Sequence, residues 1–162
     1  MEVKAELNET TIAWLHETCN EIAAQAQRNC QMDDEGKQLK GSYSAVVDES
    51  KGEGKVGSPL EAVYWEEFGT GEYADTGKNG GKPGREGWWV YVKGGSGYNG
   101  PTGKYNSKQA AEAVAASMRA DGYDAYATNG RRPNYTLEKA FDSVKEKAKQ
   151  QLETLLKERL GK

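Results

Sequence analysis

Two segments with a helical apolar period, one near each end of the chain, constrain the fold more than any other feature. In residues 8–32 and again in residues 136–160, apolar side chains recur at alternating spacings of three and four, which places them on one face of a helix. The first segment carries Ile12, Leu15, Cys19, Ile22 and Ala26, and the second carries Leu137, Phe141, Val144, Ala148, Leu152, Leu155 and Leu156. Two long amphipathic helices are therefore predicted to bracket the rest of the chain.

Between these helices the apolar period changes to one typical of strands. Ser42–Val47 and Lys55–Gly57 flank a segment rich in turn-forming residues and predict a β-hairpin. Further strands are predicted at Trp88–Val92 and Ala125–Thr128, and shorter helices at residues 59–68 and 107–120. The predicted fold class is α+β, with a small, mainly antiparallel sheet flanked by the long N- and C-terminal helices.

The length of 162 residues is typical of one domain, so residues 1–162 are expected to form a single domain. Its sheet and its loops are expected at about residues 42–130. Twelve of the 20 glycines lie from Gly69 to Gly103, and all but Gly69 fall in two long stretches, Thr70–Gly87 and Lys93–Asn106, that show no packing period. Because loops of this length are usually functional or disordered, they are predicted to form a binding surface that orders on a partner.

Composition and charge exclude several classes of protein. The chain has no apolar run long enough to span a membrane and its first residues do not resemble a signal peptide, so a soluble protein made in the cytoplasm is expected. A net charge of -3 gives no overall attraction to nucleic acid. Cys19 and Cys30 fall on one predicted helix about 16 Å apart, which is too far for a disulfide, so reduced and buried thiols are predicted.

Glycine-rich segments that resemble nucleotide-binding motifs do not have the required context. Gly95–Gly100 matches G-x-G-x-x-G, but Pro101 and the residues after it continue the loop where a dinucleotide site needs a helix. Gly71 and Gly77-Lys78 are spaced too widely for a phosphate loop, and Asn79 replaces the hydroxyl that binds magnesium. No cofactor is predicted.

Candidate catalytic and metal-binding residues are equally incomplete. His16 lies one helical turn before Cys19, but no further ligands follow at a recognisable spacing. Glu66 and Glu67 are adjacent and so point in different directions from a helix, whereas paired catalytic carboxylates face each other across a substrate. We therefore predict no catalytic residue and no metal site, and expect Glu67 to accept hydrogen bonds from the glycine-rich turn or from a neighbouring subunit.

Tryptophan and tyrosine dominate the large apolar side chains, which is typical of interfaces as well as of cores. In the predicted strand, Trp88, Val90 and Val92 share one face, and Trp89 and Tyr91 share the other. Both faces are apolar. The second face must therefore be covered by a helix, a long loop or another subunit.

Several motifs resemble those of the tail-component family of tailed bacteriophages, whose members are also described as neck or tail-completion proteins. The most specific is Glu67-Phe68-Gly69-Thr70-Gly71, within a segment that begins at Val56. Matching segments follow the family order over nearly the whole chain: Leu39–Ser42, Trp88–Tyr91, Gly130–Pro133, and Leu137, Ala140 and Phe141 of the last helix. Asn134-Tyr135-Thr136 stands where the family often has Phe-Leu, and residues 107–128 look like additional material compared with shorter relatives.

The resemblance implies a non-enzymatic structural protein of the virion, made in the cytoplasm of a bacterial host, that joins or completes the head-tail junction. It also implies a homo-oligomer, expected as a ring through which DNA passes, with connector and tail proteins as partners and no membrane association. The residues to which it assigns a fold-defining or interface role are Glu67, Phe68, Gly69, Thr70, Gly71, Trp88, Trp89, Arg131, Arg132 and Pro133.

An alternative function is a non-enzymatic binding module for cell-wall glycan or nucleic acid. Residues 107–128 are predicted as helix, glycine and strand, an order that resembles half of a bacterial cell-wall-glycan-binding repeat. A pull-down on peptidoglycan or DNA separates this alternative from the assembly subunit.

Overall fold

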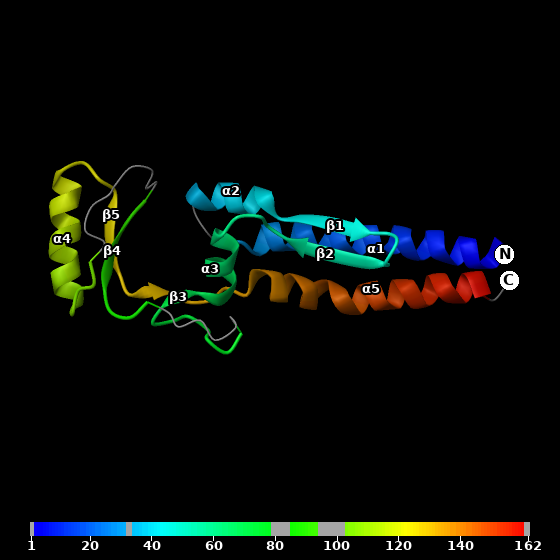
Figure 1. Ribbon diagram of the computed structural model, residues 1–162. Coiled ribbons are helices and arrows are strands. Elements are labelled where there is room, and N and C mark those ends of the chain that lie inside the picture. The colour runs from blue at the N-terminus through cyan, green and yellow to red at the C-terminus, as the bar shows by residue number, and fades with distance from the viewer. Residues whose placement is uncertain (1, 32–33, 79–84, 94–102, 161–162) are drawn as a thin grey trace. The chain divides into compact units, whose positions relative to one another are not determined.

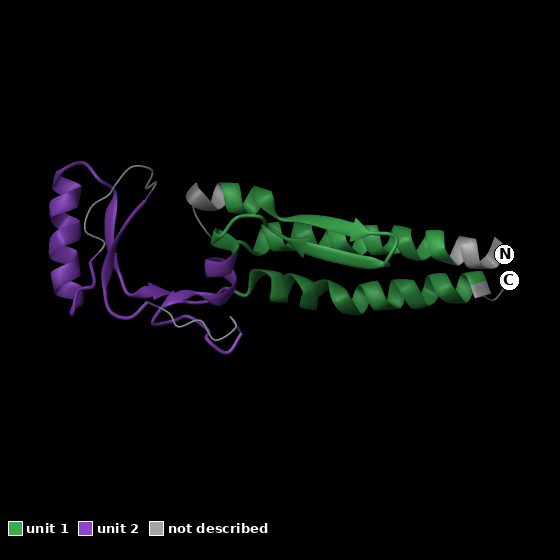
Figure 2. Cartoon of the chain, in the orientation of Figure 1, with its two compact units in different colours: residues 1–63, 135–162 green, residues 64–134 purple. Residues whose placement is uncertain are grey.

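The structure is a computed structural model that describes residues 2–31, 34–78, 85–93 and 103–160 (Figure 1). Its helices are α1 (Glu2–Asn29), α2 (Asp34–Ser42), α3 (Ala62–Phe68), α4 (Lys108–Ala120) and α5 (Thr136–Leu160). Its strands are β1 (Ser44–Asp48), β2 (Glu53–Gly57), β3 (Thr70–Gly71), β4 (Trp89–Val92), β5 (Ala125–Thr128) and β6 (Gly130–Arg131). The chain divides into two compact units, residues 1–63 with 135–162 as unit 1 and residues 64–134 as unit 2 (Figure 2).

The α+β class and the long terminal helices are confirmed. The described strands form three antiparallel two-stranded sheets, β1–β2, β3–β6 and β4–β5. Parts of the two predicted glycine-rich loops, residues 79–84 and 94–102, lie outside the described residues. The expectation of a single domain stays a prediction, because a division into compact units does not decide whether the units fold together.

Unit 1 is built on the antiparallel pair of α1 and α5, which lie side by side with the β1–β2 hairpin along α1 (Figure 1). The Trp14 indole Nε1 donates a hydrogen bond to the Ala148 carbonyl oxygen at 2.9 Å, and Lys147 Nζ lies 3.1 Å from Glu21 Oε1. The core between these elements is formed by Ile22, Ala26, Cys30, Leu39, Tyr43, Ala140, Val144 and Ala148. Burial of this apolar stripe accounts for the pairing of the helices.

The β1–β2 hairpin is closed by a side chain at its turn. Asp48 Oδ1 accepts hydrogen bonds from Ser50 Oγ at 2.6 Å and from the Lys51 backbone N–H at 3.3 Å. The hydrogen bond from Ser50 makes the largest contribution to a lowered pKa of Asp48, because such bonds stabilise the carboxylate. The predicted hairpin is confirmed with this turn at its tip.

Gly54 allows β2 to lie directly on α1. A Cβ at this position would stand 2.2 Å from Cys19 Sγ and 3.2 Å from Leu15 Cδ1. Both cysteines are buried and neither forms a disulfide, as predicted. The absence of a side chain at Gly54 therefore sets how closely the hairpin approaches the helix.

Unit 2 contains a smaller layer in which α4 covers one face of the β4–β5 sheet. Ser107 is the N-cap of α4, where its Oγ accepts a hydrogen bond from the Ala110 N–H at 3.2 Å. The buried side chains between helix and sheet are Val90, Ala115, Met118 and Ala125. The predicted helix at 107–120 and the strands at 88–92 and 125–128 are confirmed, with β4 beginning at Trp89.

Among the described residues, no helix is both long and apolar enough to cross a membrane.

The contact at Gly54 predicts a specific cost for adding one methyl group. Gly54→Ala is expected to lower the free energy of unfolding by about 2 kcal/mol, because its Cβ overlaps Cys19 Sγ in a closely packed layer. Gly57→Ala is the matched control, because it lies in the same strand and its Cβ would meet no atom within 4 Å. Urea denaturation of both variants measures the difference.

A second substitution checks the cause. In a Cys19→Ala background, Gly54→Ala is expected to cost less, since the sulfur is gone and the two changes are coupled. Equal effects of Gly54→Ala and Gly57→Ala would contradict the proposed contact.

Candidate functional site

The two segments that carry the most specific part of the resemblance meet in unit 2. Strand β3 pairs antiparallel with β6, with Thr70 opposite Arg131 and Gly71 opposite Gly130. The Arg131 backbone N–H donates a further hydrogen bond to Thr70 Oγ1 at 3.0 Å. The motif at residues 67–71 and the motif at residues 130–133 thus form one local structure, although most of unit 2 separates them along the chain.

A fully buried carboxylate joins these segments. Glu66 Oε1 accepts a hydrogen bond from Asn134 Nδ2 at 2.8 Å, and Glu66 Oε2 lies 2.8 Å from the Arg131 guanidinium Nη2. The Asn134 backbone N–H donates to the Glu66 carbonyl oxygen at 2.9 Å. We call Glu66, Arg131 and Asn134 the Glu66 clamp. Since a buried charge is costly without partners, the clamp fixes the end of α3 against the residues that precede α5.

The two glycines of the motif permit this close approach. Gly69 has a φ of +71° and Gly71 a φ of +62°, a region that residues with a Cβ rarely adopt. A Cβ on Gly69 would stand 2.6 Å from the Arg131 carbonyl oxygen. A Cβ on Gly71 would stand 2.1 Å from the Asn129 carbonyl oxygen and 2.6 Å from Trp89 Cη2. Both glycines are therefore required by geometry at the β3–β6 contact.

The remaining motif residues surround the clamp with aromatic contacts. The half-buried Phe68 ring packs edge-on against Tyr64, with ring centroids 4.9 Å apart, and Glu67 beside it is buried. The Arg132 guanidinium lies 5.1 Å from the centre of the Tyr73 ring. Pro133 contacts Gly69, because a Cβ on Gly69 would stand 2.8 Å from the Pro133 nitrogen.

The two predicted tryptophans lie in different environments. Trp89 lies over Gly71 and under the Arg85 guanidinium, which is 5.1 Å from its ring centre. Trp88 forms a β-bridge with Tyr105, and Lys108 Nζ lies 5.9 Å from its ring centre. Trp89 thus belongs to the surroundings of the clamp, whereas Trp88 faces the start of α4.

The sequence leads us to consider Glu66 only as a catalytic carboxylate and Asn134 only as a departure from the family pattern, yet they supply two of the three side chains in the clamp. Because Glu66 and Glu67 are adjacent and both are buried, only the folded chain shows which carboxylate meets Arg131. A usable signal was the pair of acidic residues in a short apolar helix together with the two arginines at 131 and 132, since buried charges are normally paired.

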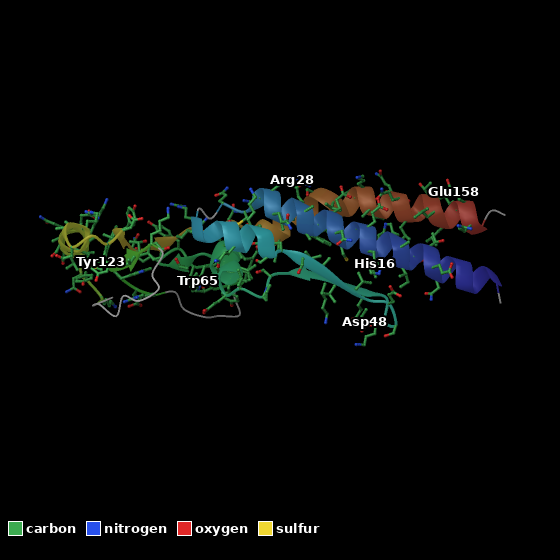
Figure 3. The ribbon with its side chains drawn as sticks, turned by 90° about the horizontal axis from the view of Figure 1, so that it is seen from above. His16, Arg28, Asp48, Trp65, Tyr123 and Glu158 are labelled. Carbon is green, nitrogen blue, oxygen red and sulfur yellow. The ribbon has the colours of Figure 1, made fainter. Side chains whose placement is uncertain are left out.

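The titratable groups considered as catalytic or metal-binding candidates make the following contacts within the fold. Both oxygens of Glu66 are engaged by the clamp. His16 Nε2 lies 3.0 Å from Glu49 Oε1, so the imidazole pairs across to the hairpin turn near Asp48 (Figure 3). Burial raises the pKa of the Cys19 thiol, which disfavours the thiolate. Within the described ranges, no three His, Cys, Asp or Glu side chains gather where they could hold a metal ion.

No protein-family model, no curated protein and no solved structure matches this chain.

The clamp predicts a large difference between two otherwise similar glutamates. Glu66→Gln is expected to lower the free energy of unfolding by about 2 kcal/mol, because it removes the charge that offsets Arg131 in a buried setting. Glu86→Gln is the control: Glu86 is 86% exposed in its ion pair with Lys104, and its change is expected to be under about 0.5 kcal/mol. Denaturant unfolding of the two variants provides the comparison, and equal costs would show that the clamp adds no stability.

Proposed function

We propose that this chain is a non-enzymatic structural subunit of the head-tail junction of a tailed bacteriophage, a neck or tail-completion protein that acts by oligomerisation. The observation that carries the proposal is that residues bearing the resemblance also build one local structure: Gly69, Thr70 and Gly71 against Gly130, Arg131 and Pro133. Residues that determine a local structure such as the β3–β6 contact are the ones expected to recur among proteins that share it.

The distribution of exposed apolar side chains supports an assembly role. Seven large apolar side chains are exposed among the described residues, and five of them are aromatic and lie in unit 2. These are Trp65, Tyr73, Tyr91, Tyr123 and Tyr126, of which Figure 3 labels Trp65 and Tyr123. Tryptophan and tyrosine are enriched at protein interfaces because they combine apolar area with a polar group.

Under this proposal the chain is made in the bacterial host cytoplasm and is then incorporated into the virion, with connector and tail proteins as neighbours and DNA passing through the assembly. The test is sedimentation velocity over a concentration series, followed by negative-stain electron microscopy of any discrete species. A closed ring of more than two subunits is expected. A chain that forms no such ring, alone or with the connector and tail proteins of its own phage, would overturn the proposal.

Phe68 provides a more local test. Phe68→Ala is expected to lower the free energy of unfolding of the subunit by about 2 kcal/mol, because the half-buried ring packs on Tyr64. Denaturation measures this cost, and sedimentation measures assembly. Unchanged stability with loss of assembly would assign Phe68 to an interface, and no change in either would contradict its place in the motif.

A further inference from the structure

In the part of the chain that the structure describes, α4 covers one face of the β4–β5 sheet and the centre of the other face is exposed. On the covered face, Val90 and Ala125 pack against α4. The other face carries the alternate residues Trp89, Tyr91 and Lys93 along one strand and Thr128, Tyr126 and Asp124 along its neighbour. We call these six residues the open face. Tyr91 is 39% exposed and Tyr126 is 48% exposed, so its centre is accessible to a partner.

The residues of the open face lie opposite one another in matched pairs. Tyr91 is the cross-strand partner of Tyr126, and Trp89 is the partner of Thr128. The Lys93 backbone N–H donates to the Asp124 carbonyl oxygen at 2.8 Å, which extends the ladder by one residue. A hydrogen bond to the Asp124 carboxylate raises the pKa of the Tyr126 hydroxyl, and the cations Lys93 and Arg119 act on it in the opposite sense.

The layer below the open face is too small to order the sheet strongly by itself. Among the described residues, the fully buried cluster of this layer has four side chains, two of them alanines, and Val92, Tyr105 and Val114 pack against it while partly exposed. Two-stranded sheets are marginal in water, and stable domains cover a sheet with a second layer. The open face therefore has a physical reason to acquire a second layer in the assembled protein.

We propose that this second layer is the open face of another copy of the chain, related by a two-fold axis that runs parallel to β4 and β5. Such an axis places β4 of one copy over β5 of the other at the same height along the strands. Tyr91 then meets the Tyr126 ring of the second copy, and Lys93 meets its Asp124. In this arrangement each tyrosine meets a tyrosine and each lysine meets an aspartate, so two copies of the face are complementary to each other.

The charges of the open face favour a second copy over nucleic acid. At the Tyr126 end of the face the Lys93 charge is offset by Asp124, whereas a phosphate backbone needs a net cationic surface. Arg85 stacks on Trp89 at one end of the face and leaves the two tyrosines as its apolar centre. The contact is small compared with a standard interface, so it forms a weak pair whose population rises with protein concentration.

This pairing goes beyond the proposed function. A two-fold contact uses the same patch on both copies, whereas contacts around a ring join two different patches. A ring subunit can therefore exist without the pairing, and the pairing can exist in a protein that forms no ring.

The test uses the full chain and two charge reversals, Lys93→Asp and Asp124→Lys. Each variant alone places like charges opposite each other in the pair, so its self-association, measured by sedimentation velocity, is expected to weaken at least about tenfold. An equimolar mixture of the two variants is expected to associate again, because an acidic face then meets a basic one. A change that acted only within one subunit would not be repaired by mixing.

Matched controls come from the exposed ion pair of Glu86 and Lys104 in the same unit. Lys104→Asp and Glu86→Lys change the net charge by the same amounts as the two test variants and are expected to pair like the unaltered chain. Circular dichroism confirms that each variant is folded. Tyr91→Ser, which removes an aromatic ring from the centre without changing charge, is a second variant that is also expected to weaken pairing.

Three results would overturn the pairing. The first is a chain that never forms the two-fold pair at any concentration. If the tryptophan fluorescence of that monomer also responds to soluble peptidoglycan fragments or to an oligonucleotide, the open face binds a ligand instead of a second copy. The second is self-association that both charge reversals leave unchanged, because the association would then use other surfaces. That result would still agree with the proposed ring. The third is a mixture of the reversed variants that does not associate.

Discussion

The buried carboxylate of Glu66 is the constraint on which the structure of unit 2 depends. Its charge is out of contact with water, and the two side chains that compensate it come from the far end of the unit, with Asn134 68 positions along the chain. The first and last turns of unit 2 therefore lie side by side. The backbone bond from Asn134 to the Glu66 carbonyl oxygen adds to the same closure.

The glycines of the motif follow from that closure. Once Glu66 and Arg131 are paired, the chain after α3 must pass directly over the Arg131 and Asn129 carbonyl oxygens, and a Cβ on Gly69 or Gly71 would occupy the same space. The positive φ of both residues turns the chain into β3. The β3–β6 pairing, which has only two residues in each strand, is thus held in register by a buried ion pair and two glycines.

Unit 1 is stabilised by a different kind of interaction, and the difference explains what the sequence predicts. Its helices are joined by an apolar stripe whose period is local, so α1 and α5 are predictable from spacing alone. Helix α2 has no such stripe, since Leu39 is its one apolar residue, and it was not predicted. The clamp depends on pairing between distant residues, and two adjacent glutamates give no local signal as to which one faces the arginine. Spacing therefore predicts the long elements, whereas the choice of side chain at the site required the fold.

The open face shows why tyrosine would suit a surface that is exposed in the free chain and covered in the proposed pair. The Tyr126 hydroxyl has a hydrogen-bonding partner, Asp124, on the face itself, so its polar group is satisfied without a second copy. The ring below the hydroxyl still offers apolar area to a second copy. A leucine at this position would bury more readily but would expose an apolar patch in the monomer. A tyrosine whose hydroxyl is hydrogen-bonded costs little free energy when it is exposed in the monomer. It also contributes less free energy than a purely apolar side chain when it is buried in the pair, so the association stays weak and reversible.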